Sequence, residues 1–166
     1  MLVVFSGVPG VGKTAIAREL ARQIGAVHLR VDSIEQAIRT SRVVSQSLND
    51  VGYRIAYAVA GDNLRIGRVV IADSVNPLQA TRDAWVAVAN GVRVRALEIE
   101  IKCSDAEEHR RRVETRITDV SGLTLPTWEE VVSREYHPWN REHLVIETAG
   151  RTVEQSVNGL REVLAS

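Results

Sequence analysis

The chain has 166 residues, and its 21 Lys and Arg residues balance its 21 Asp and Glu residues, so the formal net charge is zero. That length is enough for one domain with its own core, and we expect a single domain over residues 1–166. Balanced charge argues against a dedicated nucleic-acid-binding protein, and the single cysteine, Cys103, excludes an internal disulfide. No apolar stretch is as long as a membrane span, and the amino terminus leads straight into an apolar run without room for a signal peptide. We therefore expect a soluble, cytoplasmic protein.

The first predicted strand, Leu2–Ser6, leads into residues 7–14, which read GVPGVGKT and match the phosphate-binding loop pattern GxxxxGKT. Glycines let the backbone N–H groups turn toward phosphate oxygens, and the helix that follows adds the positive end of its dipole. We expect Lys13 to reach the β- and γ-phosphates of a nucleotide and the Thr14 hydroxyl to bind Mg²⁺. A plain glycine turn between strand and helix is the alternative. The predicted nucleotide-binding residues of this loop are Gly7, Pro9, Gly10, Val11, Gly12, Lys13 and Thr14.

The apolar pattern alternates amphipathic helices with short strands, which is typical of a parallel α/β sheet. Polar segments separate several of these elements. The spacing predicts helices at 13–24, 34–39, 50–64, 77–90, 104–118 and 152–164, with another starting in the capping-box sequence at 127–130. It predicts the remaining strands at 27–31, 69–72, 92–101 and 144–146, a polar segment at 40–49 and a loop at 119–126.

Two of the predicted strands end in aspartate, at the sheet edge where open α/β sheets bind their ligands. Asp32 follows the second strand, where a carboxylate can accept the proton of an acceptor hydroxyl and aim that hydroxyl at a phosphate. Asp73 follows the third strand, where it is expected to hold Mg²⁺ beside the phosphate-binding loop. A helix N-cap or turn is the alternative role for both residues.

Residues 107–116 read EEHRRRVETR and carry four arginines on a predicted helix. Phosphoryl transfer needs cations against the charge of the moving group, and such cations often lie on a lid. Because Arg112 and Arg116 lie one turn apart near a loop, we expect them to have this role. The exposed, salt-bridged face of a helix explains Arg110 and Arg111, and it is the alternative explanation for the other two.

These residues resemble the small P-loop kinases that phosphorylate a hydroxyl group on something other than a nucleoside monophosphate. This group includes polynucleotide kinases, chloramphenicol phosphotransferase, adenylylsulfate kinases and gluconate kinases. The resemblance covers most of the chain. It rests on residues 7–14, Arg30-Val31-Asp32, Gln36-Ala37-Ile38, 69–74 with Arg82 and Trp85, Arg112 with Arg116, and 148–150.

The segments around the second and third strands are most similar to the polynucleotide kinases. By that resemblance Asp32 is the general base, Arg112 is the lid cation, and residues 148–151 lie near the adenine. Glu35 stands where these kinases carry an arginine, three residues after the base, which argues against a bound acceptor phosphate. The Asp-Gly-Asp run of adenylylsulfate kinases is absent, and so is the Asn-Lys-x-Asp run that would indicate guanine specificity.

We therefore expect an α/β P-loop NTPase fold, with a five-stranded parallel sheet in the order 2-3-1-4-5, helices on both faces and a small helical lid at about 110–126. The predicted activity is ATP- and Mg²⁺-dependent transfer of the γ-phosphoryl group to a hydroxyl of a small molecule or of a nucleic-acid end. Of these two acceptors, the nucleic-acid end is disfavoured by the net charge of zero. A nucleotide-binding switch or regulatory ATPase is the alternative, and adenylylsulfate, an antibiotic or a sugar acid are alternative acceptors. No membrane partner or oligomeric state is indicated. The predicted site comprises Lys13, Asp32, Arg112 and Arg116 for catalysis, Thr14 and Asp73 for Mg²⁺, and the phosphate-binding loop with Thr148, Gly150 and Arg151 for the nucleotide.

Overall fold

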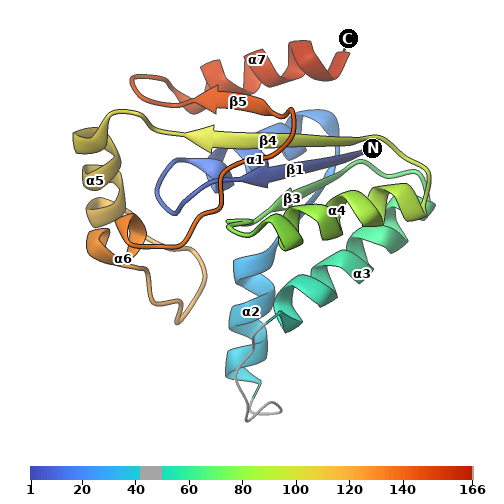
Figure 1. Ribbon diagram of the computed structural model, residues 1–166, viewed down its shortest axis with the longest axis horizontal. Helices are drawn as coiled ribbons and strands as arrows, with labels where there is room; N and C mark the ends of the chain where they lie inside the picture. Colours follow the sequence, from blue (N-terminus) through green and yellow to red (C-terminus); the bar gives the residue numbers. More distant parts are fainter. Residues whose placement is uncertain (42–49, 166) are drawn as a thin grey trace.

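The computed structural model describes residues 1–41 and 50–165, and Figure 1 shows the strands and helices that they form. The strands are β1 (Leu2–Ser6), β2 (Val27–Arg30), β3 (Val70–Asp73), β4 (Ala96–Lys102) and β5 (Leu144–Glu147). The helices are α1 (Lys13–Ile24), α2 (Val31–Thr40), α3 (Val51–Arg65), α4 (Gln79–Gly91), α5 (Ala106–Thr115), α6 (Trp128–Val132) and α7 (Val153–Ala165).

The strands form one parallel sheet in the order β2-β3-β1-β4-β5, which confirms the predicted order. Successive side chains of β1, at the centre, face opposite layers. Val3 and Phe5 pack with α1 and α7, whereas Leu2 and Val4 pack with α3 and α4. All four side chains are fully buried, which explains why β1 is a continuous apolar run. The sheet is therefore the middle layer between two layers of helices (Figure 1).

The carboxyl ends of the strands meet at one edge of the sheet, where Figure 1 shows α5 and α6. His109 of α5 is hydrogen-bonded through Nε2 to the Pro9 carbonyl oxygen at 2.9 Å, and it packs edge-on against Trp128 of α6. At Gly10, where φ is 89°, a Cβ atom would lie 2.4 Å from Val113, so a side chain there would push α5 off the loop. Thus α5 is held against the phosphate-binding loop, and α6 packs against α5.

A buried network ties α4 to β1 and to the segment between α6 and β5. The fully buried Arg82 guanidinium donates hydrogen bonds to four backbone carbonyl oxygens. These acceptors belong to Asn76 (3.0 Å), Pro77 (3.3 Å), His137 (2.8 Å) and Pro138 (3.3 Å). Trp85 Nε1 donates to Asn76 Oδ1 at 3.0 Å, and Asn76 Nδ2 donates to the Phe5 carbonyl oxygen at 2.9 Å. These hydrogen bonds therefore hold β1, the strand that leads into the phosphate-binding loop, to α4 through Asn76.

Two predicted boundaries are wrong in ways that bear on the site. The second strand ends at Arg30, so Asp32 lies in the first turn of α2. The strand stops there because β2 pairs only with β3, and Asp73, the last residue of β3, lies opposite Arg30. The helix predicted to reach residue 118 ends at Thr115, so Arg116 has an extended backbone.

Among the other predicted elements, one helix start agrees with the prediction and one strand start does not. Thr127 and the helix that it starts form the predicted capping box with Glu130. The strand expected from residue 92 begins only at Ala96, because a turn with Arg93 at a φ of 56° closes α4 first. Most of the polar segment at 40–49 lies outside the described residues. Within the described ranges, none of the helices has both the length and the apolar character that crossing a bilayer requires.

Candidate active site

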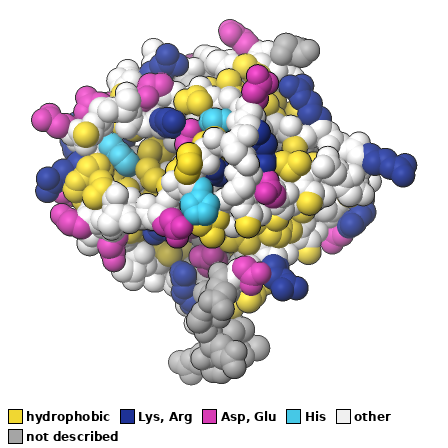
Figure 2. Space-filling view, viewed as in Figure 1, with side chains coloured by type: hydrophobic (Ala, Val, Ile, Leu, Met, Phe, Trp, Pro, Cys, Tyr) yellow, Lys and Arg dark blue, Asp and Glu magenta, His cyan; other side chains and the backbone are white. Residues whose placement is uncertain are grey.

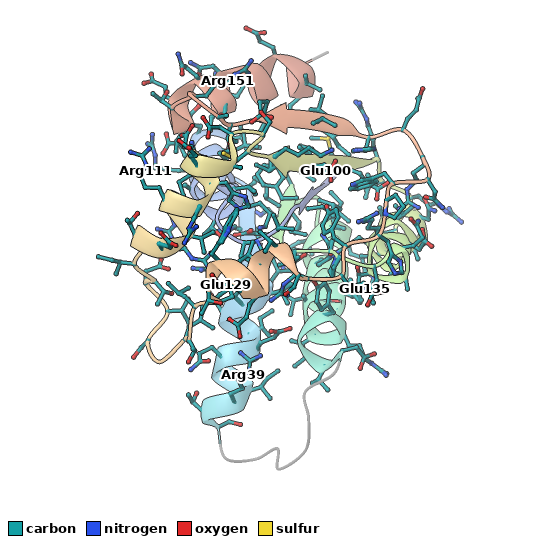
Figure 3. All side chains as sticks on the ribbon, turned by 60° about the vertical axis from the view of Figure 1, so that its left-hand side comes forward. Arg39, Glu100, Arg111, Glu129, Glu135 and Arg151 are labelled. Carbon is teal, nitrogen blue, oxygen red and sulfur yellow. The ribbon has the colours of Figure 1, made fainter. Side chains whose placement is uncertain are left out.

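A cleft of about 910 Å³ opens at the carboxyl edge of the sheet, a volume within the range of small-molecule sites. Separate elements surround this region: in Figure 3, Arg151 comes from the loop before α7, Glu129 from α6 and Arg39 from α2. The structure thus brings most of the predicted site together. The predicted residues that line the cleft are Pro9, Gly10, Gly12, Lys13, Thr14, Asp32, Asp73, Arg112, Arg116, Thr148 and Arg151.

Three further predicted residues lie next to the cleft rather than on its lining. Gly7 has a φ of 138°, and a Cβ atom there would lie 2.4 Å from a carbonyl oxygen of β4, so the chain can turn only with glycine at this point. The Val11 carbonyl oxygen accepts a hydrogen bond from Thr148 Oγ1 at 2.9 Å. The Gly150 N–H donates to Glu108 at 2.9 Å. The Val11 contact holds the loop to the end of β5, and the Gly150 contact holds the segment after β5 to α5.

Lys13 is a buried cation, 8% exposed, whose Nζ donates to a carbonyl oxygen of the phosphate-binding loop at 2.9 Å. Burial lowers the pKa of Lys13 to about 8. The charges of Asp73 and Asp32 oppose this shift, and those of Arg116 and Arg134 add to it. An anion beside Lys13 would favour the charged ammonium, and phosphate is the anion that such a loop suits.

Asp73 lies at the end of β3 and is 3% exposed, with His28 Nε2 hydrogen-bonded to its Oδ2 at 3.1 Å. Burial alone would raise the pKa of Asp73, but hydrogen bonds from His28 and Thr14 and the charge of Lys13 bring this pKa below its ordinary value. An ionised carboxylate next to a hydroxyl oxygen is a donor pair that suits Mg²⁺, which keeps other positions for water and phosphate oxygens. The N-cap alternative is wrong for Asp73, because Leu78 is the N-cap of α4.

Asp32 lines the same cleft from the first turn of α2, close enough to Lys13 to raise the pKa of the ammonium group. Its side chain is 47% exposed and lies 3.9 Å from Arg30 in an ion pair. The N-cap of α2 is Arg30, and no side chain caps that helix, so the capping alternative is wrong for Asp32 as well. The Asp32 carboxylate is therefore accessible to a second ligand in the cleft.

Arg112 is held by the protein itself. Its Nη1 donates to Thr148 Oγ1 and its Nη2 to the Thr148 carbonyl oxygen, both at 2.9 Å. Nη2 also donates to Glu108 at 2.5 Å. A Cβ atom on Gly12 would lie 4.0 Å from Nη1, so the guanidinium rests against the phosphate-binding loop. Arg112 thus forms a fixed wall between the loop and the start of α7.

Arg116 lacks such partners. Within the described part of the chain, its buried Nε and Nη2 atoms have no hydrogen-bond acceptor. Burial lowers the pKa of Arg116, Asp32 raises it, and Arg134 and Arg30 lower it. Buried guanidinium nitrogens without acceptors are costly unless an anion completes their hydrogen bonds. Arg116 is therefore arranged to meet an anion in the cleft.

Sequence reasoning missed two residues of this region. The spacing of the histidines matches no metal site and gives His28 no role, yet the parallel register puts His28 opposite Ile71 and within reach of Asp73. Its place near the end of β2 was the signal that could have identified it. Arg134, which also lines the cleft, follows the capping-box helix in a polar stretch without a recognisable pattern.

The strand–GxxxxGKT–helix unit at the centre of this sheet, with its strand order, defines the P-loop NTPase fold. The chain belongs to the AAA_33 family of AAA domains, which matches residues 2–134.

Similar solved structures include kinases. The APS kinase CysC of Mycobacterium tuberculosis, in complex with AMPPNP and APS, is 19% identical with a TM-score of 0.75, over 99% of this chain and 97% of that chain. A sugar kinase from Janibacter sp. HTCC2649 is 17% identical with a TM-score of 0.71, over 99% and 94% of the two chains. At these identities the likeness concerns the fold.

Among curated proteins, the replication factor C large subunit of Pyrobaculum arsenaticum is 33% identical over 134 residues, which is 78% of this chain. The match spans only 30% of the length of that relative.

Proposed function

We propose that this protein is an ATP- and Mg²⁺-dependent kinase that transfers the γ-phosphoryl group to a hydroxyl group. The observation that carries this proposal is the meeting of Lys13, Asp32 and Arg116 in one cleft beside the phosphate-binding loop. The kinases among the similar folds support it.

In this proposal the loop and Lys13 hold the triphosphate, with the N-terminus of α1 adding its positive dipole end. Arg112, Thr148, Gly150 and Arg151 form the wall next to the nucleotide. Thr14 and Asp73 hold Mg²⁺, which offsets the charge of the phosphate oxygens.

The chemistry is an in-line displacement. Asp32 accepts the proton of the acceptor hydroxyl while the hydroxyl oxygen bonds to the γ-phosphorus and the bond to the β,γ-bridging oxygen breaks. ADP leaves with the electrons of that bond. Lys13 and Arg116 stabilise the negative charge on the transferred group, and Arg116 has this role because its guanidinium has open donors.

A nucleotide-binding switch needs neither a proton acceptor nor an unpaired arginine beside the phosphates. The accessible carboxylate of Asp32 and the open donors of Arg116 therefore favour the kinase over the switch.

The test is a transfer assay with Mg·ATP and a panel of hydroxyl compounds: sugars, sugar acids, nucleosides, adenylylsulfate and a 5′-hydroxyl oligonucleotide. We expect ADP and a phosphorylated product with at least one acceptor, detected by mass spectrometry, and neither with Lys13→Ala. ATP binding without transfer to any compound would favour the switch.

A further inference from the structure

His28 and Asp73 come from neighbouring strands and share one face of the sheet. Successive side chains of a strand alternate between the two faces. Leu29 and Ala72 pack in the layer of α3 and α4, so their chain neighbours His28 and Asp73 point to the opposite layer. His28 lies opposite Ile71 in the register, two residues before Asp73, and its Nε2 atom reaches Asp73 Oδ2 at 3.1 Å. The topology of the sheet therefore brings an imidazole to the Asp73 carboxylate.

Asp73 differs from the other carboxylates of the cleft in its partner. Four carboxylates line the cleft, those of Asp32, Glu35, Asp73 and Asp119. An arginine nitrogen lies 3.9 Å from Asp32, 3.4 Å from Glu35 and 2.7 Å from Asp119. Over residues 1–41 and 50–165 no arginine comes that close to Asp73, whose partner is His28. Unlike an arginine, a neutral imidazole donates its hydrogen bond without cancelling the charge of the carboxylate.

The hydrogen bond from His28 restricts how Asp73 can turn. It engages Oδ2, and rotation of the carboxylate would break it, while Oδ1 stays available to another ligand. Mg²⁺ requires near-ideal octahedral geometry, so its binding is sensitive to the orientation of a carboxylate that holds it directly or through water. Partners of this kind, which contact a metal ligand rather than the metal, commonly fix the orientation of that ligand.

The charge of the protein as a whole does not replace such an oriented ligand. The net charge is zero, and acidic and basic side chains are intermixed on the face drawn in Figure 2. A broad negative field would attract cations whatever the orientation of one carboxylate, but neither observation indicates such a field. The affinity for a divalent cation therefore depends on individual side chains and on how they are held.

We propose that His28 is a positioning residue for the divalent cation, and that its Nε2–H group holds the Asp73 carboxylate in the orientation that binds Mg²⁺ beside the phosphate-binding loop. His28 acts through Asp73 and does not itself touch the metal or the reacting atoms. This inference rests on the proposed function, in which Thr14 and Asp73 hold Mg²⁺.

The protein offers a matched control for His28 away from the cleft. His143 Nε2 lies 3.2 Å from Oε2 of Glu100, a carboxylate that is 4% exposed and also pairs with Lys102. The two imidazole side chains are similarly exposed, 20% for His28 and 15% for His143. Neither His143 nor Glu100 belongs to the lining of the cleft. Replacing His143 therefore removes a comparable hydrogen bond to a buried carboxylate without changing the proposed metal site.

The test measures cation binding without turnover. Mn²⁺, which takes the same oxygen ligands as Mg²⁺, is titrated into protein kept in molar excess over AMPPNP, so that all of the nucleotide is bound. Electron paramagnetic resonance reports the free Mn²⁺. We expect His28→Leu to weaken Mn²⁺ binding at least about tenfold. His28→Gln should stay within a few-fold of wild type, because its amide nitrogen is as many bonds from Cβ as Nε2 is and can donate to Asp73. His143→Leu should leave Mn²⁺ affinity unchanged.

A second measurement on the same samples separates positioning from a structural role. The affinity for AMPPNP in EDTA, measured by calorimetry, should stay within a few-fold of wild type in every variant. If His28→Leu loses this metal-free binding together with Mn²⁺ binding, His28 belongs to the framework and the inference is overturned. If His28→Leu does not fold, His28→Asn replaces it, since its amide is one bond shorter. The Asn and Gln variants should then differ at least about tenfold in Mn²⁺ affinity, and equal affinities overturn the inference.

The outcomes also separate this inference from the kinase proposal. Unchanged Mn²⁺ affinity in His28→Leu, or an equal loss in His143→Leu, overturns the positioning role even if phosphoryl transfer is found. Mn²⁺ binding that depends on His28, in a protein that transfers nothing, supports the positioning role and contradicts the kinase. For an accepted hydroxyl, His28→Leu should raise the Mg²⁺ concentration that gives half the maximal rate at least about tenfold, and saturating Mg²⁺ should restore kcat to within a few-fold of wild type.

Discussion

Two arginines, the fully buried Arg82 of α4 and the half-buried Arg116 in the cleft, differ in how the protein treats their buried nitrogen atoms. All three nitrogens of Arg82 donate to carbonyl oxygens, and the side chain also lies over the Tyr136 and Trp139 rings, at 4.9 and 4.3 Å from their centroids. Arg116 keeps two buried nitrogens without acceptors among the described residues. A buried charge with a complete set of partners holds the fold together, whereas one with open donors is poised for a ligand.

The largest expected effect comes from removing the open guanidinium. Arg116→Ala should lower kcat by about 10³-fold or more, because an arginine at the transferred phosphoryl group acts mainly in the transition state. Nucleotide affinity, measured by calorimetry, should change only a few-fold.

Arg112→Ala is the paired variant, because it removes the arginine that Thr148 and Glu108 already hold. It should weaken nucleotide binding more than it lowers kcat. If single-turnover kinetics gave both variants the same loss of rate and the same loss of nucleotide affinity, the assignment of Arg116 to catalysis and of Arg112 to nucleotide binding would be wrong.

Removing the Arg82 side chain should change the stability of the protein rather than its catalytic rate. Arg82→Met should lower the free energy of unfolding by about 3 kcal/mol or more, since a fully buried guanidinium is removed and four carbonyl oxygens lose their donor. Denaturant titration measures this, and the folded protein should still bind Mg·AMPPNP with an affinity within a few-fold of wild type. A stable Arg82→Met protein with collapsed kcat would place Arg82 in the site rather than in the framework.

Lys13 is buried like Arg82, but like Arg116 it lines the cleft where a ligand would bind. Mg·ATP should stabilise the wild type by about 2.7 kcal/mol at a hundredfold excess over Kd, because ligand binding to the native state adds to its stability. Lys13→Ala should lose most of the resulting rise in melting temperature. An unchanged rise in that variant would contradict the phosphate-binding role of the loop.

The sequence predicted the parts of this molecule that local patterns encode. The GxxxxGKT loop, the apolar run of β1 and the alternation of strands and helices are all short-range signals, and the resemblance supplied the strand order. The different surroundings of Arg112 and Arg116 could not be predicted. Arg112 is fixed by Thr148, 36 residues away in the chain. Ile117 continues the apolar spacing of α5 yet is 96% exposed, so the helix ends without a core to bury it.

The smallest effect is expected outside both regions. Arg110 is exposed on α5, paired with Glu114 and absent from the cleft lining. Arg110→Ala should therefore leave melting temperature and kcat unchanged within error. A marked loss of kcat would mean that the basic run at 107–116 acts as a whole rather than mainly through Arg116.

The central claim is that the cleft transfers a phosphoryl group with Asp32 as proton acceptor, and the Asp32→Asn variant tests it most directly. The substitution keeps the size of the side chain but removes the proton acceptor, which typically costs 10²–10⁴-fold in rate, roughly 3–5 kcal/mol of barrier. Transfer to an accepted hydroxyl should fall by that factor, while the affinity for Mg·ATP, measured by calorimetry on the same sample, stays within a few-fold of wild type. Transfer at the wild-type rate by Asp32→Asn would contradict the account.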